Sequence, residues 1–232
     1  MSQSTTASRR FSWGMPLWQQ ILIGLVLGVV VGLLFKDGAK LLAPLGALFL
    51  NAIKMLIVPL VFVSLVAGIT CMQDTAKLGR ISVKTIAIYL VTTAFAVSIG
   101  LLFGALFTPG ADMNMVASAA VEAKQAPSLV EILVGLVPSN PVAAFAEGNI
   151  LQIIVFAIAL GVSMNLIGEK AAPAVKLFNS LAEVFYKLTD LVMRFAPIGV
   201  FALIAGVVAN HGIEVLLPLA GVIGVILSLI HI

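Results

Sequence analysis

The chain has 232 residues, of which 61% are hydrophobic and 10% are charged, with a formal net charge of +3. No soluble domain of this size could bury so much apolar surface in one core, so the composition indicates a protein embedded in lipid. The positive charge does not predict nucleic-acid binding, because the basic residues stand beside apolar runs and form no stripe interleaved with aromatic side chains.

The apolar runs predict an all-α membrane protein, because about 20 apolar residues cross a hydrocarbon core roughly 30 Å thick. We expect about six transmembrane helices, the fourth broken and the last truncated. An N-terminal segment, 1–16, precedes the membrane domain, 17–227. The spans are expected at 17–35, 41–71, 81–107, 129–167 (broken), 181–208 and 215–232.

Basic residues predict the orientation of the chain in the membrane. Arg9 and Arg10 precede the first span, and Lys77, Arg80 and Lys84 lie between the second and third. Lysine and arginine beside spans favour the cytoplasmic side, so the N-terminus is expected in the cytoplasm.

Three glycines of the first span repeat every four residues, at Gly24, Gly28 and Gly32. Glycines at this spacing let another helix approach closely and predict a specific packing seam. The alternative is the ordinary use of glycine in membrane helices.

The second span contains Pro59, which removes a backbone donor and is expected to kink the helix. Lys54 lies about one turn earlier. It can be read as a functional cation, but we favour a flexible ammonium that reaches the lipid headgroups.

The third and fourth spans carry the polar and irregular features of the chain. The third span contains Tyr89, Thr92, Thr93 and Ser98, most of them in its first half. In the fourth span the stretch 138–141 contains two prolines and an asparagine. The fourth crossing is therefore expected to be broken, with its irregular backbone covered by protein or water.

Four charged residues recur at three- and four-residue steps in the fifth run: Glu183, Lys187, Asp190 and Arg194. That spacing places them on one helical stripe. Arg194 can be read as an intramembrane cation, but we favour a helix that starts in the cytoplasmic interface with a solvated stripe.

Five stretches together are similar to the dicarboxylate/amino acid:cation symporter family, which includes bacterial glutamate/aspartate symporters. The resemblance runs from about residue 17 to about residue 227. The stretches are 51–68 (NAIKMLIVPLVFVSLVAG), 89–98 (YLVTTAFAVS), 125–130 (QAPSLV), 137–141 (VPSNP) and 194–204 (RFAPIGVFALI).

The resemblance implies an elevator-type symporter of the bacterial inner membrane, a homotrimer with a static scaffold and a moving transport domain. It places the first, second, fourth and fifth spans in the scaffold, and the third and sixth in the transport domain. The family's serine-rich hairpin tip and its Asn-Met-Asp-Gly-Thr motif do not occur in the chain. No substrate-binding residue is therefore assigned here.

The resemblance also implies a cation site on the third span. Tyr89, through its backbone carbonyl, and Thr92 and Thr93, through their hydroxyls, match positions that help to coordinate sodium in the family. Neutral oxygens suit this hard cation. The alternative is that the threonines bond back to carbonyls of the preceding turn. Proton-coupled relatives leave the coupling ion open, and no other metal or cofactor is expected.

The end of the chain departs from the resemblance. Residues 228–232 (SLIHI) are expected to be a non-native tail in which His231 has no role, and the alternative is a genuine, short, divergent end. Either reading leaves the last helix too short to cross a bilayer.

We therefore predict the N-terminal fragment of a secondary active transporter that couples uptake of glutamate, aspartate or related dicarboxylates to sodium or proton symport. On its own, the fragment is expected not to transport. The alternative is a membrane assembly module that trimerises through the scaffold spans. Enzyme motifs such as His-Glu-x-x-His and Gly-x-Ser-x-Gly are absent, and Cys71, the single cysteine, excludes an internal disulfide bond and a thiolate cluster.

Overall fold

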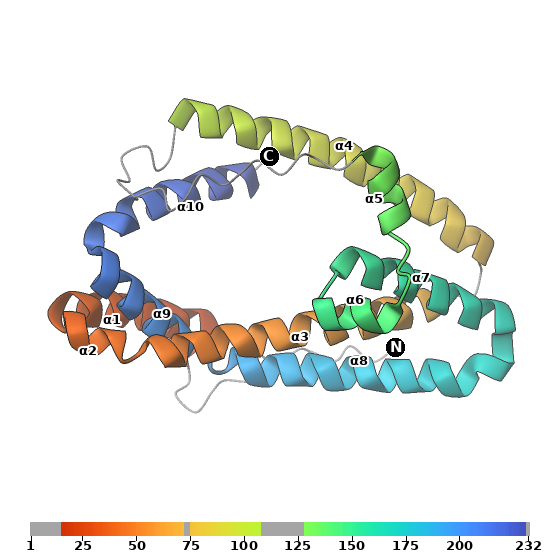
Figure 1. Ribbon diagram of the computed structural model, residues 1–232, viewed down its shortest axis with the longest axis horizontal. Helices are drawn as coiled ribbons and strands as arrows, with labels where there is room; N and C mark the ends of the chain where they lie inside the picture. The colour runs from red at the N-terminus through yellow and green to blue at the C-terminus, as the bar shows by residue number, and fades with distance from the viewer. Residues whose placement is uncertain (1–14, 72–74, 108–127, 231–232) are drawn as a thin grey trace. The chain divides into compact units, whose positions relative to one another are not determined.

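The computed structural model describes residues 15–71, 75–107 and 128–230, and within these ranges the chain is helical and contains no β-strand (Figure 1). This confirms the predicted all-α class. The helices are α1 (Leu17–Leu34), α2 (Lys36–Lys40), α3 (Ala43–Thr70), α4 (Thr75–Phe107), α5 (Leu129–Gly135), α6 (Pro141–Glu147), α7 (Ile150–Ile167), η1 (Gly168–Ala171), α8 (Ala172–Met193), α9 (Ala196–His211), η2 (Ile213–Val215) and α10 (Leu216–Ile230).

Four helical stretches of the described residues are long and apolar enough to cross a bilayer. They are 17–34, 38–70, 79–106 and 150–193, and α9 is a shorter apolar helix. The protein is therefore an integral, multi-pass membrane protein. Most of the predicted segment 1–16, and His231 in the predicted tail, lie outside the described residues.

The chain divides into two compact units. The first contains Met1–Lys54 and Thr189–Gly221, and the second contains Met55–Leu188 and Val222–Ile232. The division falls within α3, α8 and α10, so each of these helices contributes to both units.

In the first unit, α1 packs along α9 through the glycines of the predicted seam (Figure 1). Gly24, Gly28 and Gly32 are all buried. A Cβ atom on Gly28 would lie 2.7 Å from the carbonyl oxygen of Phe201, and one on Gly32 would lie 2.8 Å from that of Ala205. Any side chain would push the two backbones apart, so the seam is confirmed, and α9 of the same chain is its partner.

The same unit also holds α3 against α9 through small residues. A Cβ atom on Gly199 would fall within the buried ring of Phe49, and one on Gly46 would lie 2.8 Å from a δ carbon of Leu203. Glycine is therefore found on both helices at their points of closest approach. α9 is therefore the common partner of α1 and of the first half of α3.

In the second unit, aromatic rings gather around Phe62 of α3. Its ring meets Phe145 edge-on at 4.8 Å, Phe178 edge-on at 5.7 Å and Phe156 in a stacked arrangement at 5.8 Å between centroids. These geometries are favourable for aromatic pairs. Adjacent to them lies a core in which Val66 is fully buried. The cluster joins α3 to α6, α7 and α8.

The C-terminal end of α3 is fixed to α7 by a hydrogen bond and a close contact. Asn165 donates its side-chain Nδ2 to the carbonyl oxygen of Ile69 at 2.9 Å. Ile69 is in the last turn of α3, where carbonyls have no partner within the helix. A Cβ atom on Gly161 would lie 2.9 Å from Cγ2 of Ile69. Asn165 therefore caps α3 from the neighbouring helix.

The expected break in the fourth segment is present as three separate helices, α5, α6 and α7. Ser128 and Glu131 form a capping box at the start of α5. The Asn140 side chain accepts from the first backbone N–H groups of α6, and Gly148 ends that helix with a φ of 69°. The polar residues that predicted the break thus satisfy the backbone groups that it exposes.

Two segments differ from the expected ranges. The helix of the third segment begins at residue 75 and not at 81, and the fifth segment starts at residue 172 and divides into α8 and α9 at Arg194 and Phe195. Pro197 lies in the first turn of α9, where its missing N–H costs nothing, so the proline marks the start of a helix. Pro59, by contrast, lies inside the continuous helix α3.

Candidate functional site

The residues singled out for cation binding lie together near the middle of α4. Tyr89 is 67% exposed, and Thr92 and Thr93 are also exposed. None of the 18 residues in the apolar window of this helix is buried within the structure. The three oxygens are therefore grouped on an open helix.

The hydroxyl of Thr92 bonds back to its own helix. It donates to the carbonyl oxygen of Ile88 at 3.0 Å and lies 3.2 Å from that of Tyr89. Ser98 behaves in the same way and donates to the carbonyl of Ala94 at 2.8 Å. The alternative considered for these threonines, a bond to the preceding turn, is thus present at Thr92.

This bond is compatible with a cation ligand, because it uses only the hydroxyl hydrogen. A hydroxyl carries two lone pairs in addition to its hydrogen, and a carbonyl also has two. Donation by Thr92 leaves the two lone pairs of its own hydroxyl available, and this oxygen lies 3.2 Å from the carbonyl oxygen of Tyr89. A complete sodium shell needs more oxygens than α4 supplies. Among the described residues, no three His, Cys, Asp or Glu side chains come together as a metal site.

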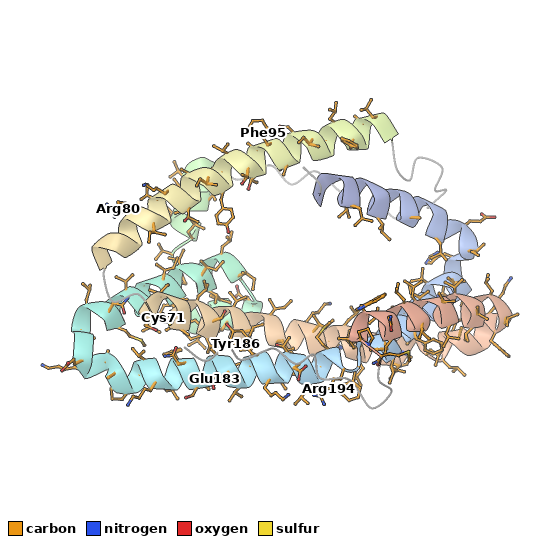
Figure 2. The ribbon with its side chains drawn as sticks, turned by 180° about the vertical axis from the view of Figure 1, so that it is seen from behind. Cys71, Arg80, Phe95, Glu183, Tyr186 and Arg194 are labelled. Carbon is orange, nitrogen blue, oxygen red and sulfur yellow. The ribbon has the colours of Figure 1, made fainter. Side chains whose placement is uncertain are left out.

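The other charged residues considered earlier lie at exposed or half-buried positions. Lys54 is exposed on α3. Arg194, half-buried directly after α8, forms an ion pair with Asp190 at 3.4 Å, one helical turn away (Figure 2). Glu183 and Lys187 of the same stripe are exposed as well. This agrees with the favoured interpretation of a solvated stripe, since the guanidinium has a local carboxylate partner.

A cavity that sequence reasoning did not single out lies where α3 and α7 end and α8 begins. Its polar lining includes Thr70, Asn165, Glu169 and Lys176. The signals in the sequence were a lone asparagine near the end of an apolar run and a glycine followed by charged residues. Neither signal shows which helix ends meet, so the cavity could not be assembled from the sequence.

Comparisons with known proteins give one consistent result. The model of the sodium:dicarboxylate symporter family matches residues 17–232. The proton/sodium-glutamate symport protein of Bacillus caldotenax is 38% identical over 89% of this chain and 52% of its own length. The C4-dicarboxylate transport protein of Bacillus subtilis is 36% identical over 87% of this chain and 49% of its own length.

A third relative, the proton/glutamate-aspartate symporter of Escherichia coli, is 38% identical over 87% of this chain and 51% of its own length. The chain thus spans about half the length of the curated relatives that it matches. The matched range extends through residues 228–232, and their assignment as a non-native tail stays a prediction.

Proposed function

Because the chain belongs to the sodium:dicarboxylate symporter family, we propose that it acts in a secondary transporter that couples uptake of an acidic amino acid or dicarboxylate to sodium ions or protons. The match of the family model to residues 17–232 is the observation that carries this proposal. The names of the relatives, glutamate symporters and C4-dicarboxylate transport proteins, support the substrate class. The activity is proposed for a protein of the relatives' full length.

Within this proposal, Tyr89, Thr92 and Thr93 provide part of a cation site. Their oxygens are neutral, and hard cations such as sodium accept such ligands. The whole of α4 contains no Asp, Glu or His. The helix therefore offers no carboxylate or imidazole side chain to carry a proton through the membrane, which supports sodium over a proton at this position.

A fusion protein tests the proposal. The chain is joined to the half of the Bacillus caldotenax relative that it does not match, and the product is reconstituted into liposomes. We expect labelled glutamate or succinate to accumulate when a sodium or pH gradient is imposed. A fusion protein that inserts and stays monodisperse but shows no gradient-driven uptake would contradict the proposal.

Variants of the same fusion test the cation site. Thr92→Val and Thr93→Val are expected to raise the sodium concentration needed for half-maximal uptake several-fold, and Thr92→Ser to preserve it. Ser98→Ala is the matched control, because Ser98 is another back-bonded hydroxyl on α4. Equal sodium dependence in all four variants would remove the threonines from the site.

The homotrimer and the cytoplasmic N-terminus belong to the same proposal. Light scattering of the purified protein measures the number of subunits. Chemical labelling of Cys71 reports the orientation of the chain in the membrane, because Cys71 is the only cysteine in the sequence and is exposed at the end of α3 (Figure 2). A membrane-impermeant maleimide should label it in inverted vesicles and not in intact cells. Labelling in intact cells would reverse the predicted orientation.

A further inference from the structure

A polar cavity of about 450 Å³ opens at the junction of three helix ends in the second unit. This volume lies within the range of small-molecule sites, roughly 300–1,000 Å³. The lining comes from the end of α3, the end of α7, the turn η1 and the first turns of α8. It consists of Thr70, Met164, Asn165, Gly168, Glu169, Ala172, Val175 and Lys176.

The inner wall of the cavity is fixed by packing. The hydrogen bond from Asn165 to the carbonyl of Ile69 holds the end of α3 on α7, and Met164 and Thr70 are buried beside it. Gly168 turns the chain away from α7 with a φ of 68° and a ψ of −134°, a conformation open to glycine. A Cβ atom at Gly168 would meet no atom within 4 Å, which agrees with open space at the turn.

The charged side chains of the lining have opposite signs. Glu169 and Lys176 are both exposed, and no other residue of the lining carries a formal charge. The remaining wall combines apolar side chains, such as Val175, with the polar groups of Thr70 and Asn165. A carboxylate favours a primary ammonium and a lysine ammonium favours an oxyanion, so the lining is complementary to a zwitterion that contains both groups.

The location favours a lipid over a free solute. The cavity lies at the end of the candidate span 38–70 and directly after the apolar helix α7, so we place it near the lipid headgroups. Lys176 lines the cavity and Lys170 follows Glu169 of the lining, and basic residues beside spans favour the cytoplasmic side. Basic pockets between membrane helices on that side bind phosphate-containing lipid headgroups, and the apolar part of the wall can accept the start of an acyl chain.

We propose that this cavity binds the headgroup of phosphatidylethanolamine, with the phosphate at Lys176 and the ammonium at Glu169. A free amino acid shares the same pair of charged groups but has no acyl chain for the apolar wall. The site is distinct from α4, and it does not depend on the transport proposal.

Native mass spectrometry of the purified chain tests the inference. The protein is titrated in detergent with phosphatidylethanolamine, phosphatidylcholine and phosphatidylglycerol of the same acyl chains. We expect about tenfold tighter binding of phosphatidylethanolamine than of phosphatidylcholine, because the quaternary ammonium cannot donate a hydrogen bond to Glu169. Equal binding of these two lipids, or tighter binding of phosphatidylglycerol, would overturn the proposal without any variant.

Matched variants locate the site. Glu169→Gln should remove the preference for phosphatidylethanolamine over phosphatidylcholine, and Lys176→Gln should weaken both lipids. The controls are Lys170→Gln and Glu183→Gln, which remove exposed charges of the same sign outside the lining. If Lys170→Gln changes lipid binding as much as Lys176→Gln, or Glu183→Gln as much as Glu169→Gln, the effect reflects general surface charge and the cavity is not the binding site. Displacement of the lipid by millimolar glycine would identify a free zwitterion as the ligand and would also overturn it.

Discussion

Replacing Gly28 by alanine should destabilise the contact between α1 and α9. The new Cβ atom would lie 2.7 Å from the carbonyl oxygen of Phe201, 3.1 Å from Cβ of Ile204 and 3.3 Å from the backbone nitrogen of Ala205. Ordinary contact begins at 3.4 Å. Two of these three atoms are backbone, so a rotamer change cannot relieve the overlap and the helices must separate.

The expected cost follows from overpacking a close contact, which is about 1–3 kcal/mol. Alanine also favours the helix over glycine by about 1 kcal/mol, which would hide part of that cost. Gly206→Ala is therefore the reference variant. Gly206 lies inside α9 and is buried, yet a Cβ atom there would meet nothing within 4 Å. Both variants gain the same helix propensity, so their difference in stability isolates the seam.

Unfolding of the purified protein by SDS in mixed micelles measures this difference, and the fluorescence of Trp18 in α1 reports the separation of the helices. Gly28→Ala should have a free energy of unfolding about 1–3 kcal/mol below that of Gly206→Ala. If the two variants unfold at the same SDS fraction, α1 and α9 do not approach as closely as the structure has them, and the reasoning is refuted.

Three further predictions use the same unfolding assay. Gly199→Ala should lower the free energy of unfolding by about 1–3 kcal/mol. The loss should be clearly smaller in a protein that already carries Phe49→Ala, because the ring that blocks the new methyl group is then gone. Additive effects of the two substitutions would contradict this contact. Asn165→Leu should cost about 0.6–2 kcal/mol through loss of the cap on α3, and an unchanged stability would show that the hydrogen bond contributes nothing. Phe62→Ala should lower the free energy of unfolding by about 3–5 kcal/mol, because Phe62 is the centre of the aromatic cluster. Phe95→Ala should lower it much less, because Phe95 is 67% exposed on α4 (Figure 2). Similar losses in the two variants would argue against the cluster.

The helices themselves could be predicted from the sequence because apolar length and helix breakers act locally. The run that became α1 was expected within one residue at its C-terminal end, and the break between α5 and α6 followed from the prolines and asparagine at 138–141. The start of α8 at residue 172 was not expected. This helix is amphipathic and carries charges along its length, so a search for continuous apolar runs does not detect its first turns.

Partners of the helices could not be predicted, because they depend on contacts distant in sequence. The spacing of Gly24, Gly28 and Gly32 predicted a seam, but only the structure identifies α9 as the helix that fills it. This changes the weight of the alternative function. The seam was one of two features that could support assembly between chains, and α9 of the same chain already occupies it. The alternative therefore rests on the scaffold spans alone.

Two hydroxyls of α4 show how a polar membrane helix can be stable in lipid. The hydroxyls of Thr92 and Ser98 each donate their hydrogen to a carbonyl of the same helix, so neither hydroxyl needs a partner from outside α4. The lone pairs of the Thr92 hydroxyl stay available in that arrangement. The bond within the helix and the proposed role as a cation ligand therefore do not exclude one another. Only a measurement of cation dependence can distinguish these two roles of Thr92, because a stability measurement reports the bond within the helix alone.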